Sequence, residues 1–287
     1  MDFKMHEYTH AVVGKVVPAL RATDRADMND SRRQYDYYLR LLKELNLELI
    51  EIETDAFFPE NIVLEDLAIV CHGIVLMPRP ISATEEIIMT ALKDVFLGEL
   101  GHDIIEITDP EAKLAGSDVL FTGREFFVGI SETSNEAGAC ALAEAFPEFP
   151  CTPIKVAKGV RHLKRYFSMA GPDILCVASS KEAQEMLKRI EREATFTYQT
   201  LTVPENGAAN CLYVNGTLIH RAIEEIPESF KVFCEKIDFA RRSICFSGLA
   251  KVSTGLTACC LLVAFIIYNT KRLHLAHFTP AQYLNFD

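Results

Sequence analysis

Residues 119–130 read Val119-Leu120-Phe121-Thr122-Gly123-Arg124-Glu125-Phe126-Phe127-Val128-Gly129-Ile130, two apolar runs joined by a turn that contains Gly123. Two β-rich runs on either side of a short Gly-containing turn are typical of a β-hairpin. Similar strand or hairpin signals lie at residues 9–13, 67–77, 174–178 and 210–220, and an apolar stretch begins at Leu256. Their interval of about fifty residues is one at which repeat architectures are suspected.

Segments with helical periodicity lie between these hairpins, at residues 30–45, 85–97, 135–146, 180–194 and 227–237. Each can lay its apolar stripe against the outside of the strands. Ser180 suits an N-cap, Pro227 suits a first helical turn, and the Asn215-Gly216 pair suits a type I′ hairpin turn. The sequence therefore predicts an α/β fold of roughly five strand-hairpin-plus-helix units around a pseudo-axis.

Composition narrows the class of protein. The chain has 287 residues, of which 49% are hydrophobic and 24% charged, so it can bury a large core. Its net charge of -11 disfavours nucleic acid as a partner, because an acidic surface repels phosphate. The nine cysteines include no CxxC pair and no Cys/His ligand spacing. We therefore expect neither a disulfide framework nor a metal site, and a reduced, cytoplasmic compartment.

No linker divides the chain, so we expect a single domain over residues 1–287, with residues 271–287 as a loose C-terminal extension. The N-terminus lacks the apolar segment of a secretory signal. Residues 252–270 carry no charge, but the apolar run at 261–268 is shorter than the roughly 20 residues that span a bilayer. We expect this run to form a buried strand and the protein to have no membrane partner.

Candidate polar residues lie near the expected turns. Glu65 and Asp66 are adjacent, and on a strand neighbouring side chains point to opposite faces, so at most one of them should face a given pocket. A buried carboxylate needs a partner, which could be a cationic ligand such as a guanidinium or the backbone amides of a structural turn. Asp118 directly precedes an apolar strand, where a carboxylate also serves as a simple cap.

A histidine and two cysteines complete the candidate chemistry. His162 lies in an unusually basic stretch with Arg161 and Arg165, and it could be a general acid/base or a solvent-exposed residue. Cys259 and Cys260 begin an apolar run, where cysteine is an ordinary core residue. Cysteine with a distant His and Asp is nevertheless the set used in thiolate catalysis.

The chain resembles the dimethylarginine dimethylaminohydrolase family, part of the guanidino-modifying (pentein) superfamily. The resemblance covers about residues 5–265 and lies in residues 9–13, 64–70, 118–129, 162–164 with 168–172, 201–204 and 208–211. It implies a five-bladed α/β propeller, the pentein fold, with pseudo-five-fold repeats. It also implies a small-molecule guanidino substrate, no cofactor, and a monomer or homodimer.

The resemblance implies that a cysteine thiolate attacks the guanidinium carbon of an N-methylated arginine, expels methylamine or dimethylamine, and yields citrulline. His162 would protonate the leaving amine and later activate water, and Asp118 would orient the imidazolium. The substrate-binding residues implied by the resemblance are Leu20, Glu60, Glu65, Asp66 and Val252.

Two positions depart from the family pattern. The family binds the substrate carboxylate with two arginines, and those positions are Glu85 and Thr133 here. Hydrogen bonds to charged groups contribute roughly 1.5 to 3 kcal/mol each, so losing both would weaken amino-acid binding by about two to four orders of magnitude. Arg161 and Arg165 could replace the missing carboxylate clamp or could simply be exposed loop residues.

Two alignments assign the family's nucleophilic cysteine to different residues of this chain. An ungapped alignment from Lys251 puts Ala258 at the family's cysteine, whereas a one-residue loop insertion makes Cys259 the nucleophile and keeps a Cys-Cys pair with Cys260. A short loop insertion is energetically cheap, so we favour Cys259. If Ala258 occupies the site, the sequence predicts a catalytically impaired homologue with a ligand-binding or regulatory role.

Overall fold

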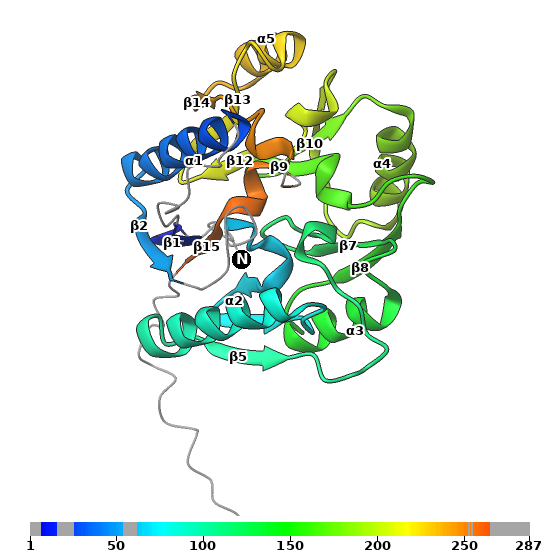
Figure 1. Ribbon diagram of the computed structural model, residues 1–287. Coiled ribbons are helices and arrows are strands. Elements are labelled where there is room, and N and C mark those ends of the chain that lie inside the picture. Colours follow the sequence, from blue (N-terminus) through cyan, green and yellow to red (C-terminus); the bar gives the residue numbers. More distant parts are fainter. Residues whose placement is uncertain (1–6, 16–25, 54–61, 252, 254, 265–287) are drawn as a thin grey trace, which may run out of the picture.

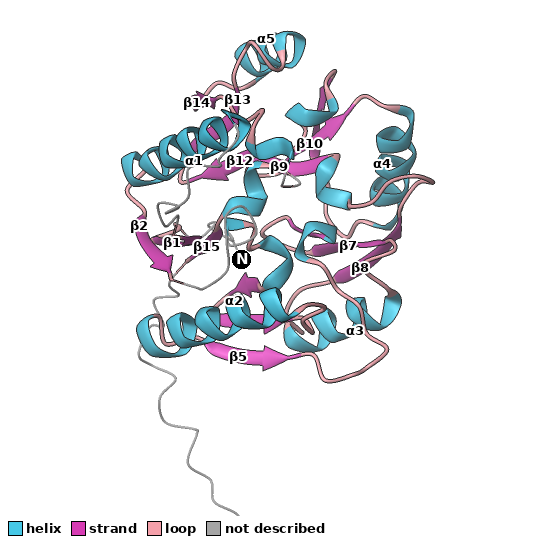
Figure 2. Cartoon of the chain, in the orientation of Figure 1, coloured by secondary structure: helices cyan, strands magenta, loops and turns pink. Residues whose placement is uncertain are grey.

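The computed structural model describes residues 7–15, 26–53, 62–251, 253 and 255–264. These residues form five three-stranded sheets around a common centre, with the five labelled helices on the outside (Figure 1). Figure 2 shows the same arrangement with the helices in cyan and the strands in magenta. The last strand pairs with the first, which closes the ring. The predicted propeller of five repeated units is confirmed.

Every unit has the same topology: the first strand is antiparallel to the second, a helix follows, and the third strand is parallel to the second. In order around the ring the units are β15 (Leu261–Val263), β1 (His10–Gly14), α1 (Ala26–Glu44) and β2 (Glu48–Ile52); β3 (Ile69–Cys71), β4 (Ile74–Met77), α2 (Ala83–Asp94) and β5 (Asp103–Glu106); β6 (Val119–Phe121), β7 (Phe126–Ile130), α3 (Glu136–Ala145) and β8 (Cys151–Lys155); β9 (Phe167–Gly171), β10 (Ile174–Ala178), α4 (Lys181–Glu193) and β11 (Gln199–Val203); and β12 (Leu212–Val214), β13 (Thr217–Arg221), α5 (Pro227–Lys236) and β14 (Ala240–Ile244).

Local sequence signals explain the ends of several elements. Asn215 and Gly216 both have positive φ, 45° and 86°, as a type I′ turn between β12 and β13 requires. The Ser180 hydroxyl accepts the amide of Ala183 at the start of α4, and Pro227 opens α5. These three predictions are confirmed. Among the described residues, no helix is both long and apolar enough to cross a bilayer.

Two predictions about local structure are wrong. Glu65 and Asp66 lie in a short 3-10 helix, Glu65–Leu67, and not on a strand, so the expected alternation of faces does not apply to them. The apolar stretch that begins at Leu256 also starts with a 3-10 helix, Leu256–Cys259. The buried strand expected at 261–268 is confirmed for Leu261–Val263, and residues 265–268 lie outside the described residues. A three-residue 3-10 helix is too short to produce a periodic pattern.

A 3-10 helix precedes the first strand of every unit, and these short helices meet at the centre. They are Glu65–Leu67, Gly116–Asp118, Leu163–Arg165, Asn206–Ala208 and Leu256–Cys259. Hydrogen bonds connect them around the ring: the Leu64 amide donates to the Ala258 carbonyl, and the Asn210 side chain donates to the Lys164 carbonyl and to Thr257. We call this set the central turns.

The central turns approach one another closely at Gly116. A Cβ atom added there would lie 1.8 Å from the carbonyl oxygen of Glu65, which is backbone and cannot move aside alone. Only glycine therefore permits this contact between two turns.

We expect Gly116→Ala to lower the free energy of unfolding by at least about 1–3 kcal/mol, the range for overpacking a well-packed site. The control is Gly98→Ala, because Gly98 lies in a short π-helix and a Cβ there meets no heavy atom within 4 Å. That variant should be neutral or slightly stabilising. Thermal unfolding measures both, and equal midpoints for the two variants would contradict the close approach.

Candidate active site

Asp118 is the buried anchor of the site. It lies at the end of a central turn, and its side chain is fully buried. One carboxylate oxygen accepts hydroxyl hydrogen bonds from Ser131, Thr133 and Ser134 at 2.7, 2.9 and 2.8 Å. The other oxygen accepts the backbone amide of Leu163 at 2.9 Å. These donors replace the water that the carboxylate loses on burial.

The His162 imidazole faces Asp118 from the neighbouring central turn. Its Nδ1 atom lies 3.9 Å from an Asp118 carboxylate oxygen, an ion-pair distance, and 2.9 Å from the hydroxyl of Ser117. Burial raises the pKa of Asp118, but the contacts with His162 and the hydrogen bonds outweigh it, so this pKa lies below the ordinary value. Asp118 in turn raises the pKa of His162 against the opposing effect of burial. The pair therefore favours an anionic Asp118 and a cationic His162.

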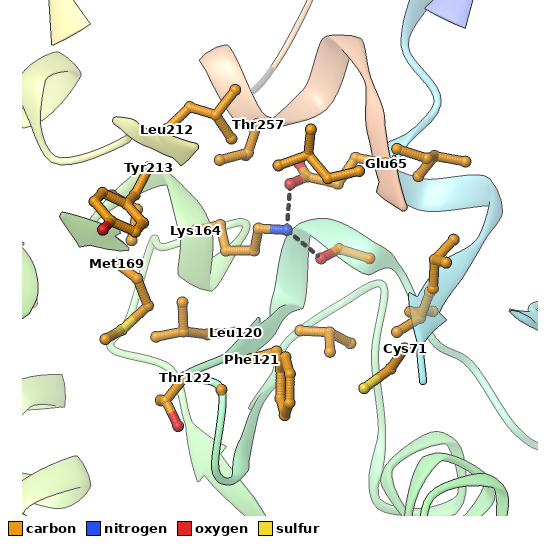
Figure 3. Close-up of a pocket in the computed structure, with 18 of the residues that line it drawn as sticks. Glu65, Cys71, Leu120, Phe121, Thr122, Lys164, Met169, Leu212, Tyr213 and Thr257 are labelled. Atoms are coloured by element: carbon orange, nitrogen blue, oxygen red, sulfur yellow. Dashed lines mark hydrogen bonds and ion pairs between the residues drawn. The ribbon is translucent and has the colours of Figure 1, made fainter. Parts of the chain in front are cut away.

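Glu65 and Asp66 lie on the next central turn and have different partners. The Glu65 carboxylate forms an ion pair with the ammonium group of Lys164, which also donates to the Gly116 carbonyl at 3.2 Å (Figure 3). Asp66 accepts the Ser117 amide at 2.8 Å. Burial and the charge of Glu65 raise the pKa of Asp66, whereas the hydrogen bonds from Ser117 lower it.

A central cavity of about 250 Å³ lies against this ion pair. It is lined by residues of all five first strands, mostly apolar, among them Cys71, Phe121, Met169, Leu212 and Leu261. In Figure 3 the Lys164 side chain points across the cavity toward Glu65. The Lys164–Glu65 ion pair therefore lines the central cavity together with these apolar residues.

Both candidate nucleophiles are buried thiols. Cys259 lies in a central turn, and burial together with the neighbouring Cys260 raises its pKa, opposed by a hydrogen bond with Ser253. Burial raises the pKa of Cys260 to about 12, although its hydrogen bond with the Tyr38 hydroxyl, at 3.2 Å, opposes the increase. Cys260 lines the central cavity. Neither thiol is ionised to a large extent at neutral pH in this state.

The two positions that depart from the family pattern have local roles. Glu85 lies in the first turn of α2, where its carboxylate accepts the Ile81 amide at 2.8 Å and its own amide donates to the Ser82 hydroxyl. This resembles a capping box, except that the carboxylate accepts the amide of Ile81, the residue before the N-cap Ser82, and not the amide of Ser82 itself. Thr133 hydrogen-bonds to Asp118, so it supports the buried carboxylate.

Three predicted substrate-binding residues, Leu20, Glu60 and Val252, lie outside the described residues, as does the predicted extension at 271–287. Arg161 and Arg165 are exposed on either side of His162.

The sequence did not predict the contacts of Ser117 and Lys164, although both residues lie in segments that carry the family resemblance or adjoin it. Among the described residues, no cluster of His, Cys, Asp and Glu is suited to hold a metal ion.

Comparison with known proteins identifies the family. No family model matches the chain. The human protein named "Putative hydrolase DDAH2" is 32% identical over 232 residues, which cover 78% of this chain and 81% of that protein. The chain belongs to the dimethylarginine dimethylaminohydrolase (DDAH) family. The N(G),N(G)-dimethylarginine dimethylaminohydrolase of Pseudomonas aeruginosa is 22% identical over 200 residues, 68% of this chain and 74% of that enzyme.

Solved structures share the fold of this DDAH family member. A DDAH from Pseudomonas aeruginosa complexed with citrulline has a TM-score of 0.71 and 18% identity, over 90% of this chain and all of that one. The N-terminal domain of a cyanobacterial arginine dihydrolase, bound to its substrate, has a TM-score of 0.71 and 15% identity, over 89% and 98% of the two chains. An amidinotransferase from Microseira wollei has a TM-score of 0.72 at 12% identity, over 89% and 94%.

We expect Asp118→Asn to reduce stability at neutral pH by about 1–3 kcal/mol, because an amide NH₂ group faces hydroxyl donors in place of an acceptor. The native pKa of Asp118 is below its unfolded value of about 3.9, so its stabilisation is present above about pH 4 and disappears as pH falls through the native pKa. The gap in unfolding free energy between wild type and variant should therefore shrink in acid.

The control is Asp109→Asn, since Asp109 accepts one amide in an exposed turn. This variant should show only a small gap at either pH. A gap for Asp118→Asn that stays constant from neutral pH into acid would contradict an ionised, hydrogen-bonded Asp118.

Proposed function

We propose that the protein is a hydrolase that converts an N-methylated arginine, such as dimethylarginine, to citrulline plus methylamine or dimethylamine. The observation that carries this proposal is the Asp118–His162 pair, held 3.9 Å apart next to the turn that bears Glu65 and Asp66. An imidazolium supported by a buried carboxylate is a proton donor, and neighbouring carboxylates attract a guanidinium cation.

The proposed reaction uses three side chains in sequence. The Cys259 sulfur forms a bond to the guanidinium carbon, and His162 gives its proton to the amine as the carbon–nitrogen bond breaks. The neutral imidazole then takes a proton from water, whose oxygen displaces the sulfur and leaves citrulline. Asp118 keeps the imidazole oriented in both steps.

Burial of Cys259 has a consequence for this mechanism. In the protein without substrate, burial raises the pKa of the Cys259 thiol. A guanidinium bound beside the sulfur would stabilise the thiolate and so lower this pKa. Ionisation of the nucleophile then accompanies substrate binding. Glu65 already pairs with Lys164, so we assign the guanidinium to Asp66, the other carboxylate of this turn.

Glu85 and Thr133 affect which substrates the protein can bind, because they occupy the positions of the family's two carboxylate-binding arginines. Both are engaged locally, in a helix cap and in the Asp118 network, and neither supplies the cation that binds a substrate carboxylate in the family pattern. Guanidino compounds without the α-carboxylate are therefore candidate substrates beside dimethylarginine.

A second candidate function is ligand binding without turnover. The observation that favours it is the complete burial of Cys259 with a raised pKa, together with the two positions that depart from the family pattern. On this alternative the propeller retains a site for a guanidino ligand and has lost the hydrolytic step.

The test is a citrulline assay on purified protein with dimethylarginine, arginine and decarboxylated guanidines. We expect citrulline or its decarboxylated counterpart to form, and Cys259→Ser and His162→Ala each to reduce the rate by at least about a thousandfold. The matched control is Cys140→Ser, because Cys140 is an exposed thiol on α3 and is not among the residues that line the central cavity. It should keep the wild-type rate.

The outcomes separate the alternatives. Loss of activity in Cys260→Ser, with Cys259→Ser active, would move the nucleophile by one residue. No turnover of any of these compounds, with saturable binding of one of them by calorimetry, would overturn the hydrolase in favour of the binding protein.

A further inference from the structure

Each of the five first strands contributes one half-buried, mainly apolar side chain to the wall of the central cavity. The five are Val70, Phe121, Met169, Tyr213 and Leu262. On β3, β12 and β15 this residue is the middle one between two buried neighbours, as expected where alternate side chains of a strand point to opposite faces. Figure 3 shows Phe121, Met169 and Tyr213 around the same space. The wall of the cavity is therefore apolar and rich in aromatic and sulfur groups.

The cavity is large enough for a small organic ligand. Its volume is about 250 Å³, whereas an apolar cavity of about 150 Å³ is sufficient to bind benzene. Ligand sites are typically concave and mostly apolar, with few polar groups that orient the ligand. An aromatic ring suits this wall, because Phe121 and Tyr213 offer ring contacts and the thioether of Met169 packs favourably on aromatic groups.

Lys164 supplies a hydrogen-bond donor to this apolar space. Its ammonium group has three N–H donors, and among the described residues it contacts two acceptors, the Glu65 carboxylate and the Gly116 carbonyl. Its side chain is 17% exposed and points across the cavity in Figure 3. One N–H is therefore left for an acceptor atom of a ligand.

The charges at the cavity favour a ligand without net charge. The charges of Lys164 and Glu65 sum to zero, and no other Asp, Glu, Lys or Arg is found among the described residues of the lining. A carboxylate that approached Lys164 would also approach Glu65, and any charged group would lose its hydration against the apolar wall. A carbonyl oxygen avoids both costs.

The cavity is separate from the candidate catalytic residues. Within the described part of the chain, Asp118, His162 and Cys259 do not line it, and neither does Asp66. A molecule in the cavity therefore contacts none of the groups assigned to proton transfer, nucleophilic attack or guanidinium binding in the proposed reaction.

We propose that the central cavity is a second binding site, for an uncharged aromatic molecule that carries one hydrogen-bond acceptor. The ring packs against Phe121, Met169 and Tyr213, and the acceptor binds the Lys164 ammonium group. The ligand then lies against the ion pair that joins two of the central turns. This site goes beyond the proposed hydrolase and does not depend on it.

Acetophenone is a suitable probe, because it has one aromatic ring and one carbonyl oxygen. It is titrated into the full chain labelled with ¹³C-methyl methionine, and the methyl resonance of Met169 is assigned with Met169→Leu. We expect a saturable shift of this resonance, and Val70→Phe, which fills the cavity, should weaken binding by at least about tenfold. The control is Ile87→Phe, because Ile87 is exposed on α2 and does not line the cavity.

Ile87→Phe should keep the wild-type affinity for acetophenone. Absence of saturable binding to wild type would overturn the site, whether or not Val70→Phe folds. Equal affinity of wild type and folded Val70→Phe would overturn it as well.

Ethylbenzene tests the contact with Lys164, because it has nearly the same shape as acetophenone and no acceptor. In Lys164→Met the ratio of acetophenone affinity to ethylbenzene affinity should fall by about tenfold, the effect of one hydrogen bond to a charged group. An unchanged ratio in the folded variant would remove Lys164 from the site. Benzoate should bind wild type more weakly than acetophenone, and tighter binding of benzoate would contradict an uncharged ligand.

His162→Ala separates the two sites. Since His162 does not line the cavity, this variant should bind acetophenone with the wild-type affinity. Loss of acetophenone binding in folded His162→Ala would place the probe in the candidate active site and overturn the second site. None of these measurements depends on turnover, so failure here is distinct from failure of the proposed hydrolase.

Discussion

A buried carboxylate, Asp118, connects three segments of the chain that are distant in sequence. It accepts hydroxyls from the turn after β7 and the backbone amide of Leu163, and it lies itself on the central turn before β6. A buried charge without such donors would cost several kcal/mol, so the carboxylate holds these segments in one arrangement. The same charge raises the pKa of His162. Structure and candidate chemistry therefore depend on one group.

The fold could be predicted because its signals are local. The Asn215-Gly216 turn, the Ser180 cap and the apolar runs of residues 119–130 each specify a hairpin or helix end within a few residues. The central turns could not be predicted, because three residues of 3-10 helix have no period to detect. For this reason Glu65 and Asp66 were expected on a strand. The first strand of the fourth unit, β9, was missed for another reason: its residues Phe167–Gly171 include no β-branched side chain.

The site was predictable in its residue types but not in its contacts. The family resemblance selects Asp118 and His162, and the structure brings them to ion-pair distance. The Lys164–Glu65 ion pair and the Ser117–His162 contact join residues on different units of the ring, so only the closed propeller brings them together. The sequence shows Glu85 and Thr133 at positions where the family has arginines. The structure adds that each side chain forms local hydrogen bonds.

Native-state amide hydrogen exchange tests the central role of the buried carboxylates most directly. The Leu163 and Ser117 amides donate to Asp118 and Asp66, whereas the Glu111 amide donates to Asp109 in an exposed turn. If the carboxylates hold the central turns, the first two amides exchange only through global unfolding, like those of the core strand β10. Exchange of Leu163 and Ser117 as fast as that of Glu111 would contradict the account.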